Sequence, residues 1–265
     1  MSDTPPILAR KHHKQTSVFT AENMLREARR QKSLSVEIVP PVCILDPDGD
    51  ILSNLLAEGR ATLANHWACY HTRAYTFEQD GIEFGIVAHA VGASFAVLVA
   101  EELFAAGCRL LISVTSSGQI TAVQTPPYFI LIDRAMRDEG TSYHYLPASD
   151  YSEISGECAA IFDDSPDFGL PVHRGATWTT DAPFRETPQA IDYARSEGIL
   201  AVEMEAAALY AFSQARGKPV ICFAHVTNQM ASIEGDFEKG DAGGSRDALR
   251  VIAVTARAWL KKHEA

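Results

Sequence analysis

The residues with the clearest chemical potential lie at 202–208, where Glu203, Met204 and Glu205 follow an apolar run and precede three alanines. One carboxylate can accept hydrogen bonds from two vicinal hydroxyls, and a thioether can lie against a sugar or base face. A helix N-terminus favours acids through its dipole, but this explains one glutamate rather than the pair. The small alanines let a helix lie close to a sheet, so we predict a sugar-binding site with the glutamates at its mouth.

Two small polar segments have the composition of anion or water sites. Gly92-Ala93-Ser94 stands where a strand gives way to a helix, and Thr115-Ser116-Ser117-Gly118 follows an apolar strand. Backbone N–H groups and hydroxyls in such segments bind anions, although many are only turns. Phe184 offers an aromatic platform for a base, or packs on the core. Asn228 can donate to and accept from a base edge, or form a turn at a strand end.

The elements that position these residues alternate between strands and helices. The apolar patterns predict strands at 36–45, 67–79, 84–90, 110–114, 128–132, 172–179, 200–203 and 220–226, helices at 20–32, 92–106, 206–216 and 245–262, and a polar loop at 133–155. Such alternation predicts a single α/β domain at 36–265 with helices on both faces of the sheet, after a basic arm at 1–35. Ligands collect at the carboxyl ends of strands in such sheets, so the polar segments are expected to converge on one pocket.

Bulk composition excludes several classes of partner. The net charge of −11 argues against nucleic acid and anionic membranes, while a neutral nucleoside needs no basic surface. A signal-peptide core and a membrane-length apolar run are not expected. Five scattered cysteines without a CxxC pair predict buried, reduced thiols in a cytoplasmic protein and no metal site. Without a GxSxG motif, Ser113, Ser116, Asp181 and His144 do not support acyl hydrolysis.

The chain resembles the purine nucleoside and uridine phosphorylases and their hydrolytic relatives, the methylthioadenosine and AMP nucleosidases. Val-Glu-Met-Glu-Ala at 202–206 is similar to the most specific motif of this family. The similarity extends, in order and spacing over residues 38–262, through Leu45-Asp46-Pro47-Asp48, Gly92-Ala93-Ser94, residues 113–118, Thr180-Asp181 and Thr227-Asn228. It implies a three-layer α/β/α fold whose mixed central sheet is partly barrel-like.

The resemblance also implies roles for individual residues. Glu205 and Met204 would bind the ribose, with Glu203 shaping the sugar side, and Glu205 and Asn228 would be the catalytic groups. The base would be bound by Phe184, Thr180, Asp181 and Asn228. Gly92, Ser94, Ser113 and Ser116 would bind phosphate or water. His71 and Arg73 would reach the site of a neighbouring subunit in a dimer, trimer or hexamer, and no metal or organic cofactor is implied.

The phosphate-binding positions depart from the family pattern. Three arginines are expected in phosphorylases, but Ser113, Gly49 or Asp50, and Tyr70 or His71 stand at those places. Charge-assisted contacts of this kind contribute about 1.5–3 kcal/mol each. Arg73, Arg137 and Arg185 are candidate replacements. The family's leaving-group aspartate is Asn228 here, which can only hydrogen-bond the departing base.

Three activities fit these features. The first is phosphorolysis of a purine or pyrimidine nucleoside to free base and (deoxy)ribose 1-phosphate. The second is hydrolysis on the same scaffold, which the missing arginines favour, and the third is nucleoside binding with weak or lost catalysis. Base specificity stays open, because Asn228 favours a 6-oxopurine whereas Gln229 and Arg185 suit a pyrimidine equally.

Overall fold

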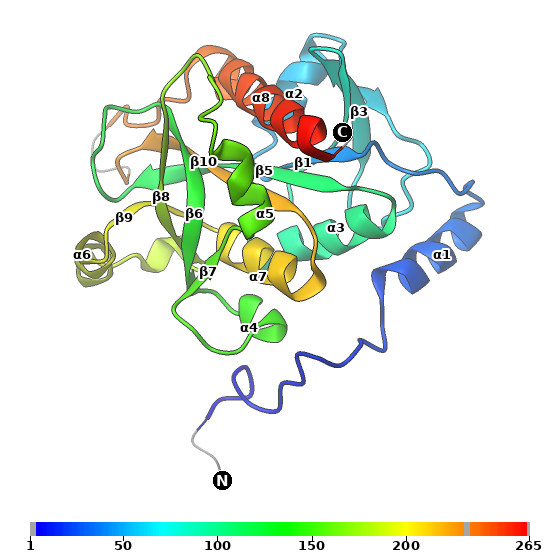
Figure 1. The fold of residues 1–265 in the computed structure, drawn as a ribbon, viewed down its shortest axis with the longest axis horizontal. Helices are drawn as coiled ribbons and strands as arrows, with labels where there is room; N and C mark the ends of the chain where they lie inside the picture. The colour runs from blue at the N-terminus through cyan, green and yellow to red at the C-terminus, as the bar shows by residue number, and fades with distance from the viewer. Residues whose placement is uncertain (1–3, 231–233, 264–265) are drawn as a thin grey trace.

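A ten-stranded mixed sheet runs through the protein, whose computed structural model describes residues 4–230 and 234–263 (Figure 1). The strands are β1 Val42–Asp46, β2 Thr62–Leu63, β3 Ala74–Gln79, β4 Ile82–Ala88, β5 Leu110–Gln119, β6 Tyr128–Asp138, β7 Tyr151–Glu153, β8 Val172–Thr180, β9 Ile199–Glu203 and β10 Val220–Asn228. The order is β10-β6-β8-β9-β5-β1-β4-β3-β2, with β7 beside β6. Because β10 also pairs with β5, the strands β5, β10, β6, β8 and β9 close into a ring. The predicted mixed, partly barrel-like sheet is therefore confirmed.

Helices cover the sheet on two sides (Figure 1). They are α1 Ala21–Lys32, α2 Asp50–Ala57, α3 Ala93–Ala105, α4 Ser142–Tyr145, α5 Gly156–Ala159, α6 Pro188–Ser196, α7 Ala206–Arg216 and α8 Ser245–His263, with short 3-10 turns η1 Ala160–Phe162, η2 Pro183–Arg185 and η3 Asp241–Gly244. One apolar cluster packs α3 and α7 against the sheet, and a second packs α2 and α8 against it. The three-layer architecture follows from these two clusters.

Helix α1 begins where the sequence predicts it. Thr20 is the N-cap, and its Oγ1 accepts a hydrogen bond from the Asn23 amide. Leu25 and Ala28 are fully buried, and the helix packs against α3. The preceding arm lies against the α4 region, where Lys11 Nζ donates to His144 Nδ1 at 3.0 Å.

Three predicted boundaries were wrong for physical reasons. The strand predicted at 36–45 starts only at Val42, because Pro40 and Pro41 have no N–H to donate to a ladder. The strand predicted at 67–79 starts at Ala74, because the preceding segment folds around Trp67, whose Nε1 donates to Thr72 Oγ1. Much of the loop predicted at 133–155 is instead β6, α4 and β7.

The strand predicted at 110–114 was also too short. It continues to Gln119, because Ser116 and Ser117 pair with His225 and Val226 of β10 to close the ring. The expected polar loop is thus a rigid barrel strand. Within the described residues, no helix is long and apolar enough to cross a bilayer.

Candidate active site

Glu203 ends β9 and is saturated by protein donors. Its Oε1 accepts from the hydroxyls of Thr177 and Thr179 on β8, and its Oε2 accepts from the amides of Glu205 and Ala206 at 2.7 Å each. The side chain is 3% exposed, and burial raises its pKa. These contacts occupy the acceptor sites of a carboxylate, so Glu203 fixes the start of α7 rather than offering free oxygens.

Glu205 lies in the turn between β9 and α7, two residues after Glu203. Its Oε1 accepts from the Gly92 amide at 2.7 Å, and its Oε2 accepts from Thr115 Oγ1 at 2.9 Å and the Met204 amide at 3.3 Å. Burial first, and then the neighbouring Glu203 charge, raise the pKa of Glu205 to about 8. The group is therefore mostly protonated at neutral pH.

A cavity of about 310 Å³ opens beside this turn, within the size range of small-molecule sites. It is lined by residues from β5, β9, β10 and the η2 loop: Ser116, Ser117, Gly118, Pro183, Phe184, Glu186, Val202, Glu203, Met204, Asn228, Met230 and Phe237. Glu205 is 1% exposed and lies behind this wall, joined to it through the Met204 amide. The cavity lining thus combines polar groups, which could bind the hydroxyls of a sugar, with apolar side chains, which could pack against a flat base.

Asn228 is held with its amide oriented. Its Nδ2 donates to Thr227 Oγ1 at 3.2 Å and to the Ser117 carbonyl at 3.4 Å, and its Oδ1 accepts from the Met230 amide at 3.0 Å. An amide oxygen has a second lone pair, so Oδ1 can accept from a ligand.

Phe184 stands at the rim of the cavity on η2 and is 99% exposed. Covering a large aromatic side chain that is exposed to water lowers the free energy, so a ligand in the cavity would be stabilised by contact with Phe184. Burial raises the pKa of the neighbouring Glu186, which lines the same cavity, to about 7.

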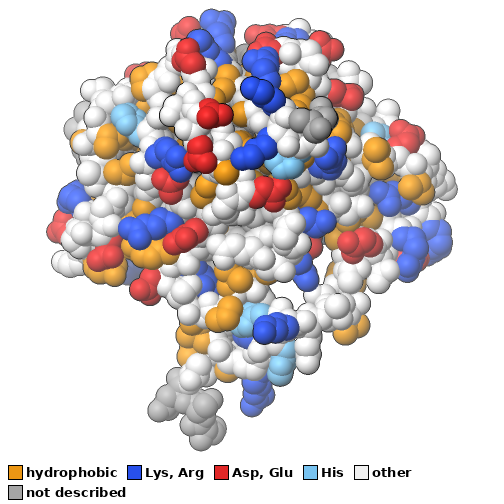
Figure 2. Space-filling model, viewed as in Figure 1, with side chains coloured by type: hydrophobic (Ala, Val, Ile, Leu, Met, Phe, Trp, Pro, Cys, Tyr) orange, Lys and Arg blue, Asp and Glu red, His pale blue; other side chains and the backbone are white. Residues whose placement is uncertain are grey.

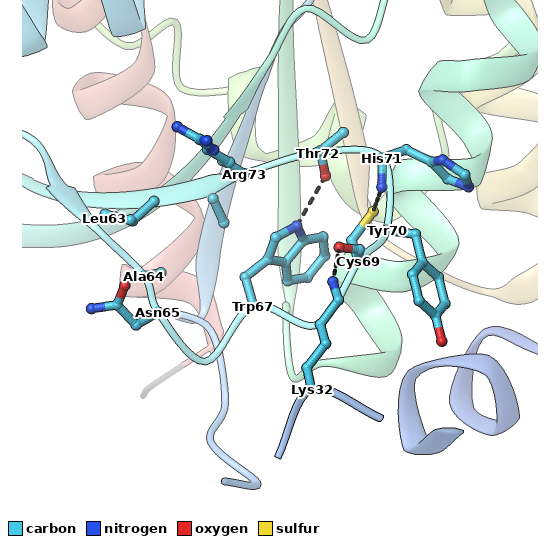
Figure 3. Close-up of a pocket in the computed structure, with 11 residues that line it drawn as sticks. Lys32, Leu63, Ala64, Asn65, Trp67, Cys69, Tyr70, His71, Thr72 and Arg73 are labelled. Carbon is cyan, nitrogen blue, oxygen red and sulfur yellow. Dashed lines mark hydrogen bonds between the residues drawn. The ribbon is translucent and has the colours of Figure 1, made fainter. Parts of the chain in front are cut away.

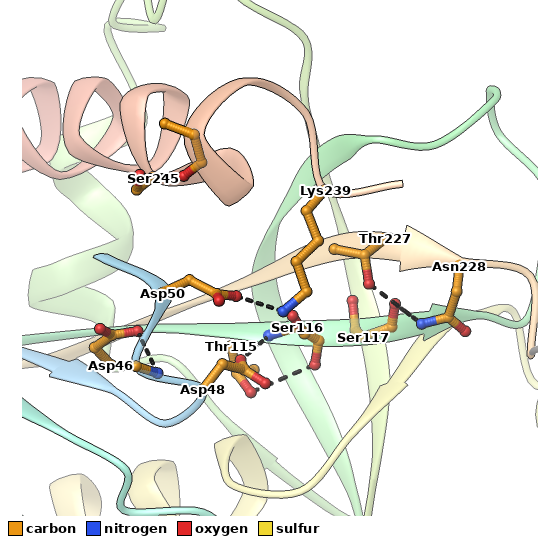
Figure 4. Close-up of polar contacts among 12 residues, drawn as sticks. Asp46, Asp48, Asp50, Thr115, Ser116, Ser117, Thr227, Asn228, Lys239 and Ser245 are labelled. Atoms are coloured by element: carbon orange, nitrogen blue, oxygen red, sulfur yellow. Dashed lines mark hydrogen bonds and ion pairs between the residues drawn. The ribbon is translucent and has the colours of Figure 1, made fainter. Parts of the chain in front are cut away.

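A second, much smaller cavity of about 20 Å³ adjoins the first and shares Ser116 with it. Figure 4 shows its acidic wall: Asp46 at the end of β1, Asp48 in the turn that follows, and Asp50 at the start of α2. Asp48 Oδ2 accepts from the Ser116 amide at 2.6 Å. Asp50 forms an ion pair with Lys239. The place where an anion would meet the Ser116 amide is thus taken by a carboxylate of the protein.

Asp46 has a structural part in this wall. It is 2% exposed and accepts from the amides of Gly49 at 3.1 Å and Leu52 at 2.9 Å, which fixes the start of α2. Burial raises the pKa of Asp46 to about 7, although these two amides oppose the shift. Gly49 has a φ of +82° and packs against His89, so a side chain there would be strained.

Several predicted site residues do not line either cavity. Asp181 Oδ2 accepts from the Gly140 amide, and Thr180 Oγ1 accepts from the Ala182 amide, so both shape the loop after β8. Ser94 is exposed on α3, and Ser113 is buried within β5. Gly92 does reach the site, through the bond from its amide to Glu205.

His71 and Arg73 lie together, away from both cavities of their own chain. With Lys32, Trp67 and Tyr70 they line a surface cavity of about 380 Å³ (Figure 3). Lys32 Nζ donates to the carbonyls of Ala68 and Cys69, which ties this segment to α1. The segment presents imidazole and guanidinium groups outward, as a contribution to another subunit would require.

Arg137 and Arg185, the other two candidate replacements for the phosphate-binding arginines, differ in whether their side chains are free to reach a ligand. Arg137 is 4% exposed, and its guanidinium donates to Ser142, Ser149 and the Pro147 carbonyl, so it organises the α4 loop. Arg185 lies on η2 beside Phe184 but does not line either cavity. Around the small cavity the described residues include one cation in contact with its wall, Lys239, through Asp50.

Lys239, His225 and the contact made by Asp48 were missed by sequence reasoning. The sequence did contain a signal for the acidic wall, because acids stand at positions 46, 48 and 50, directly after the apolar run that forms β1. Lys239 had no such signal, because it reaches Asp50 from a loop 189 residues away. Within residues 4–230 and 234–263, no cluster of His, Cys, Asp and Glu is arranged to hold a metal. All five cysteines are buried and free.

The ring-closed sheet and its paired cavities define an α/β enzyme with a ligand site at the strand ends. The chain belongs to the phosphorylase superfamily, whose family model matches residues 41–258. This confirms the predicted family and, with it, an enzyme of the nucleoside phosphorylase type, a pentosyltransferase.

Named relatives are similar at low identity. A guanosine phosphorylase of Halorubrum lacusprofundi is 27% identical over 171 residues, which cover 63% of this chain and 66% of the relative. A uridine phosphorylase of Thermococcus kodakarensis is 26% identical over 203 residues, covering 68% of this chain and 71% of the relative. The solved structure of uridine phosphorylase from Vibrio fischeri ES114, complexed with 6-hydroxy-1-naphthoic acid, superposes with a TM-score of 0.70 at 21% identity, covering 88% of this chain and 99% of that one.

Proposed function

We propose that this protein cleaves the N-glycosidic bond of a purine or pyrimidine nucleoside and transfers the pentosyl group to phosphate. The observation that carries the proposal is the 310 Å³ cavity joined at Ser116 to a small second cavity. Met204 and the Glu205 turn suit a ribose, and Asn228 and Phe184 suit a base. The names of the relatives support phosphate as the acceptor.

The reaction needs charge placement more than a covalent nucleophile. As the bond from C1′ to the base breaks, the sugar gains oxocarbenium character, and the polar groups that hold the ribose stabilise the developing positive charge. Phosphate oxygen attacks C1′, and Asn228 hydrogen-bonds the departing base. Lys239 reaches the wall of the acceptor cavity through its ion pair with Asp50. No metal or organic cofactor takes part in this scheme.

The setting proposed for this activity is a homo-oligomer in the cytoplasm, with a nucleoside and inorganic phosphate as its small-molecule partners. Buried free thiols and the net charge of −11 support a reducing compartment and argue against nucleic acid. On the face shown in Figure 2, Lys and Arg side chains are interspersed with Asp and Glu. Such a surface attracts a polyanion weakly.

The test is base release from inosine, guanosine, adenosine, uridine and methylthioadenosine in phosphate buffer. Glu205→Gln is expected to lower kcat/KM by about 2- to 10-fold, because a hydrogen bond between neutral groups contributes about 0.5–1.5 kcal/mol. Glu83→Gln, an exposed glutamate on β4, is the matched control and should behave as the unchanged protein. Saturable nucleoside binding without release of any base would overturn the proposal in favour of a binding protein.

A further inference from the structure

A cavity of about 420 Å³ lies between the N-terminal arm, α1, α3 and the end of α7, and it shares no lining residue with either cavity of the active site. Its volume is within the range of small-molecule sites. Helix α1 packs against α3, and α3 packs against α7 (Figure 1). Residues from the segment 16–24 form one wall, and they precede residues 41–258, the part of the chain that the family model matches. The matched part alone would therefore lack this wall.

Much of the lining of this cavity is apolar. It includes Met24 from α1, Leu98, Phe104 and Ala105 from α3, and Tyr145 from α4. Moving apolar surface from water to such walls lowers the free energy, and the two aromatic rings offer large faces for packing. The lining therefore suits a ligand whose larger part is apolar.

Glu102 of α3 is a buried polar group in the same lining. It is 1% exposed, and neither of its carboxyl oxygens has a hydrogen-bond partner among the residues that the structure describes. Buried polar groups almost always have a partner, and leaving one without a partner costs free energy. A ligand that donates hydrogen bonds to Glu102 would remove this cost.

The cations around Glu102 are engaged elsewhere or exposed. Arg216 Nε donates to Glu101 Oε1 at 3.1 Å, so this arginine belongs to the neighbouring acid. Lys32, whose charge acts on Glu102, donates to two backbone carbonyls. Lys218 lines the cavity but is exposed. Glu102 is thus a buried acid for which the described residues supply no contacting cation.

We propose that this cavity binds a small amine with an apolar body, whose ammonium group donates hydrogen bonds to Glu102. An ammonium carries three N–H donors for the two unpartnered oxygens, and its charge is opposite to that of an ionised carboxyl. A hydroxyl offers one donor and no charge, and a carboxylate offers acceptors only. The apolar body of the amine lies along Met24, Leu98 and Phe104. The inference does not depend on nucleoside cleavage, because the two sites share no lining residue.

Binding of an amine at Glu102 should release protons. Burial raises the pKa of Glu102, while Cys69, His71 and Lys32 oppose the rise. An ammonium in contact favours the ionised carboxyl, so a proton leaves Glu102 as the amine binds. The number of protons released should fall as pH rises, because Glu102 is then ionised before binding. An occupant held by apolar contacts alone would release none.

Isothermal titration calorimetry of the full chain compares three head groups on one apolar body: phenylbutylamine, phenylbutanol and phenylbutanoate. The amine should bind one site per chain, about 10-fold more tightly than the alcohol or more. Titrations in two buffers of different ionisation enthalpy give the number of protons released. Glu102→Gln should weaken amine binding by about 10-fold or more and abolish proton release. Glu22→Gln is the matched control, because Glu22 lines the same cavity but is exposed, and it should change the affinity by less than about 3-fold.

Leu98→Trp tests the location of the site. Leu98 lines the cavity and is 38% exposed, so the larger side chain can be accommodated while it fills part of the cavity. It should weaken binding of the amine and of the alcohol alike, and melting curves establish that each variant is folded.

Four results would overturn the inference. They are no saturable binding of the amine, as when a second copy of the chain covers the cavity; binding of the alcohol or the acid as tight as that of the amine; an unchanged amine affinity in Glu102→Gln; and an unchanged amine affinity in Leu98→Trp. Base release from nucleosides, measured separately, decides the proposed function whatever the outcome here.

Discussion

Glu203 and Glu205 are separated by one residue, yet their carboxylates have different environments. Glu203 accepts from two hydroxyls and two amides and so is fully engaged. Glu205 has fewer donors and lies nearer Ser116 and Asp48, whose charge adds to the rise in its pKa. The pair divides into a residue that builds the turn and a residue that can respond to a ligand.

The raised pKa of Glu205 makes stability depend on pH. Its pKa is about 8 in the folded protein and near 4.5 when unfolded, so the folded state holds a proton that the unfolded state loses between these values. The stabilising contribution is complete below about pH 4.5 and is lost as pH rises toward 8. Glu205→Gln is expected to show a smaller fall in the free energy of unfolding from pH 5 to 8. Urea titrations at a series of pH values measure this, and equal slopes in both proteins would contradict it.

The sequence was sufficient to locate Glu205 and Asn228 but not to find the role of Asp48. The two former residues belong to local motifs, and motif spacing predicted their neighbourhood. The Asp48 contact joins a turn to a backbone amide 68 residues away, and a side chain's partner at that range follows from the fold. Thr180 and Asp181 show another limit, since their motif suggested ligand contact, whereas the bonds that their side chains make in the structure lie within the loop.

At the scale of elements, strand type was predicted better than strand length. Apolar runs located β5 and β6, whereas their polar ends at Ser116 and Arg137 gave no periodic signal. Those ends are strands because closure of the ring gives them partners on β10 and β8. Pairing between distant segments, rather than local preference, decided where these strands end.

The η2 loop is expected to close on bound nucleoside through Phe184. Since this ring is 99% exposed, stacking on a base adds about 0.5–1.5 kcal/mol. Phe184→Ala should therefore raise the KM for nucleoside by about 2- to 10-fold with a smaller change in kcat. Tyr193→Ala on α6, an exposed aromatic residue outside the 310 Å³ cavity, is the control. Unchanged KM in Phe184→Ala would show that the loop stays open.

At the scale of the whole molecule, exposed apolar side chains gather on either side of α1. Val18 and Phe19 precede the helix and are 99% and 75% exposed, and Val36 and Ile38 follow it at 82% and 73%. Apolar side chains exposed to water do not stabilise a single chain, whereas a contact with another subunit would bury them. The nearby segment with His71 and Arg73 turns its charged groups outward (Figure 3). Both features support a homo-oligomer in which this segment meets another copy.

A mixing experiment tests whether His71 and Arg73 complete the site of a neighbour. The double variant His71→Ala, Arg73→Ala and the single variant Glu205→Gln should each have low activity. When they are unfolded together and refolded, mixed oligomers contain one site with an intact Glu205 and an intact neighbouring segment. Activity should then rise above that of either parent. Where the two defects fall together in one site of the mixed oligomer, another site carries neither of them. Arg60→Ala, in the exposed turn after α2, is the control and should be fully active alone. Light scattering gives the number of subunits, and a monomer, or a double variant with full activity, would contradict a shared site.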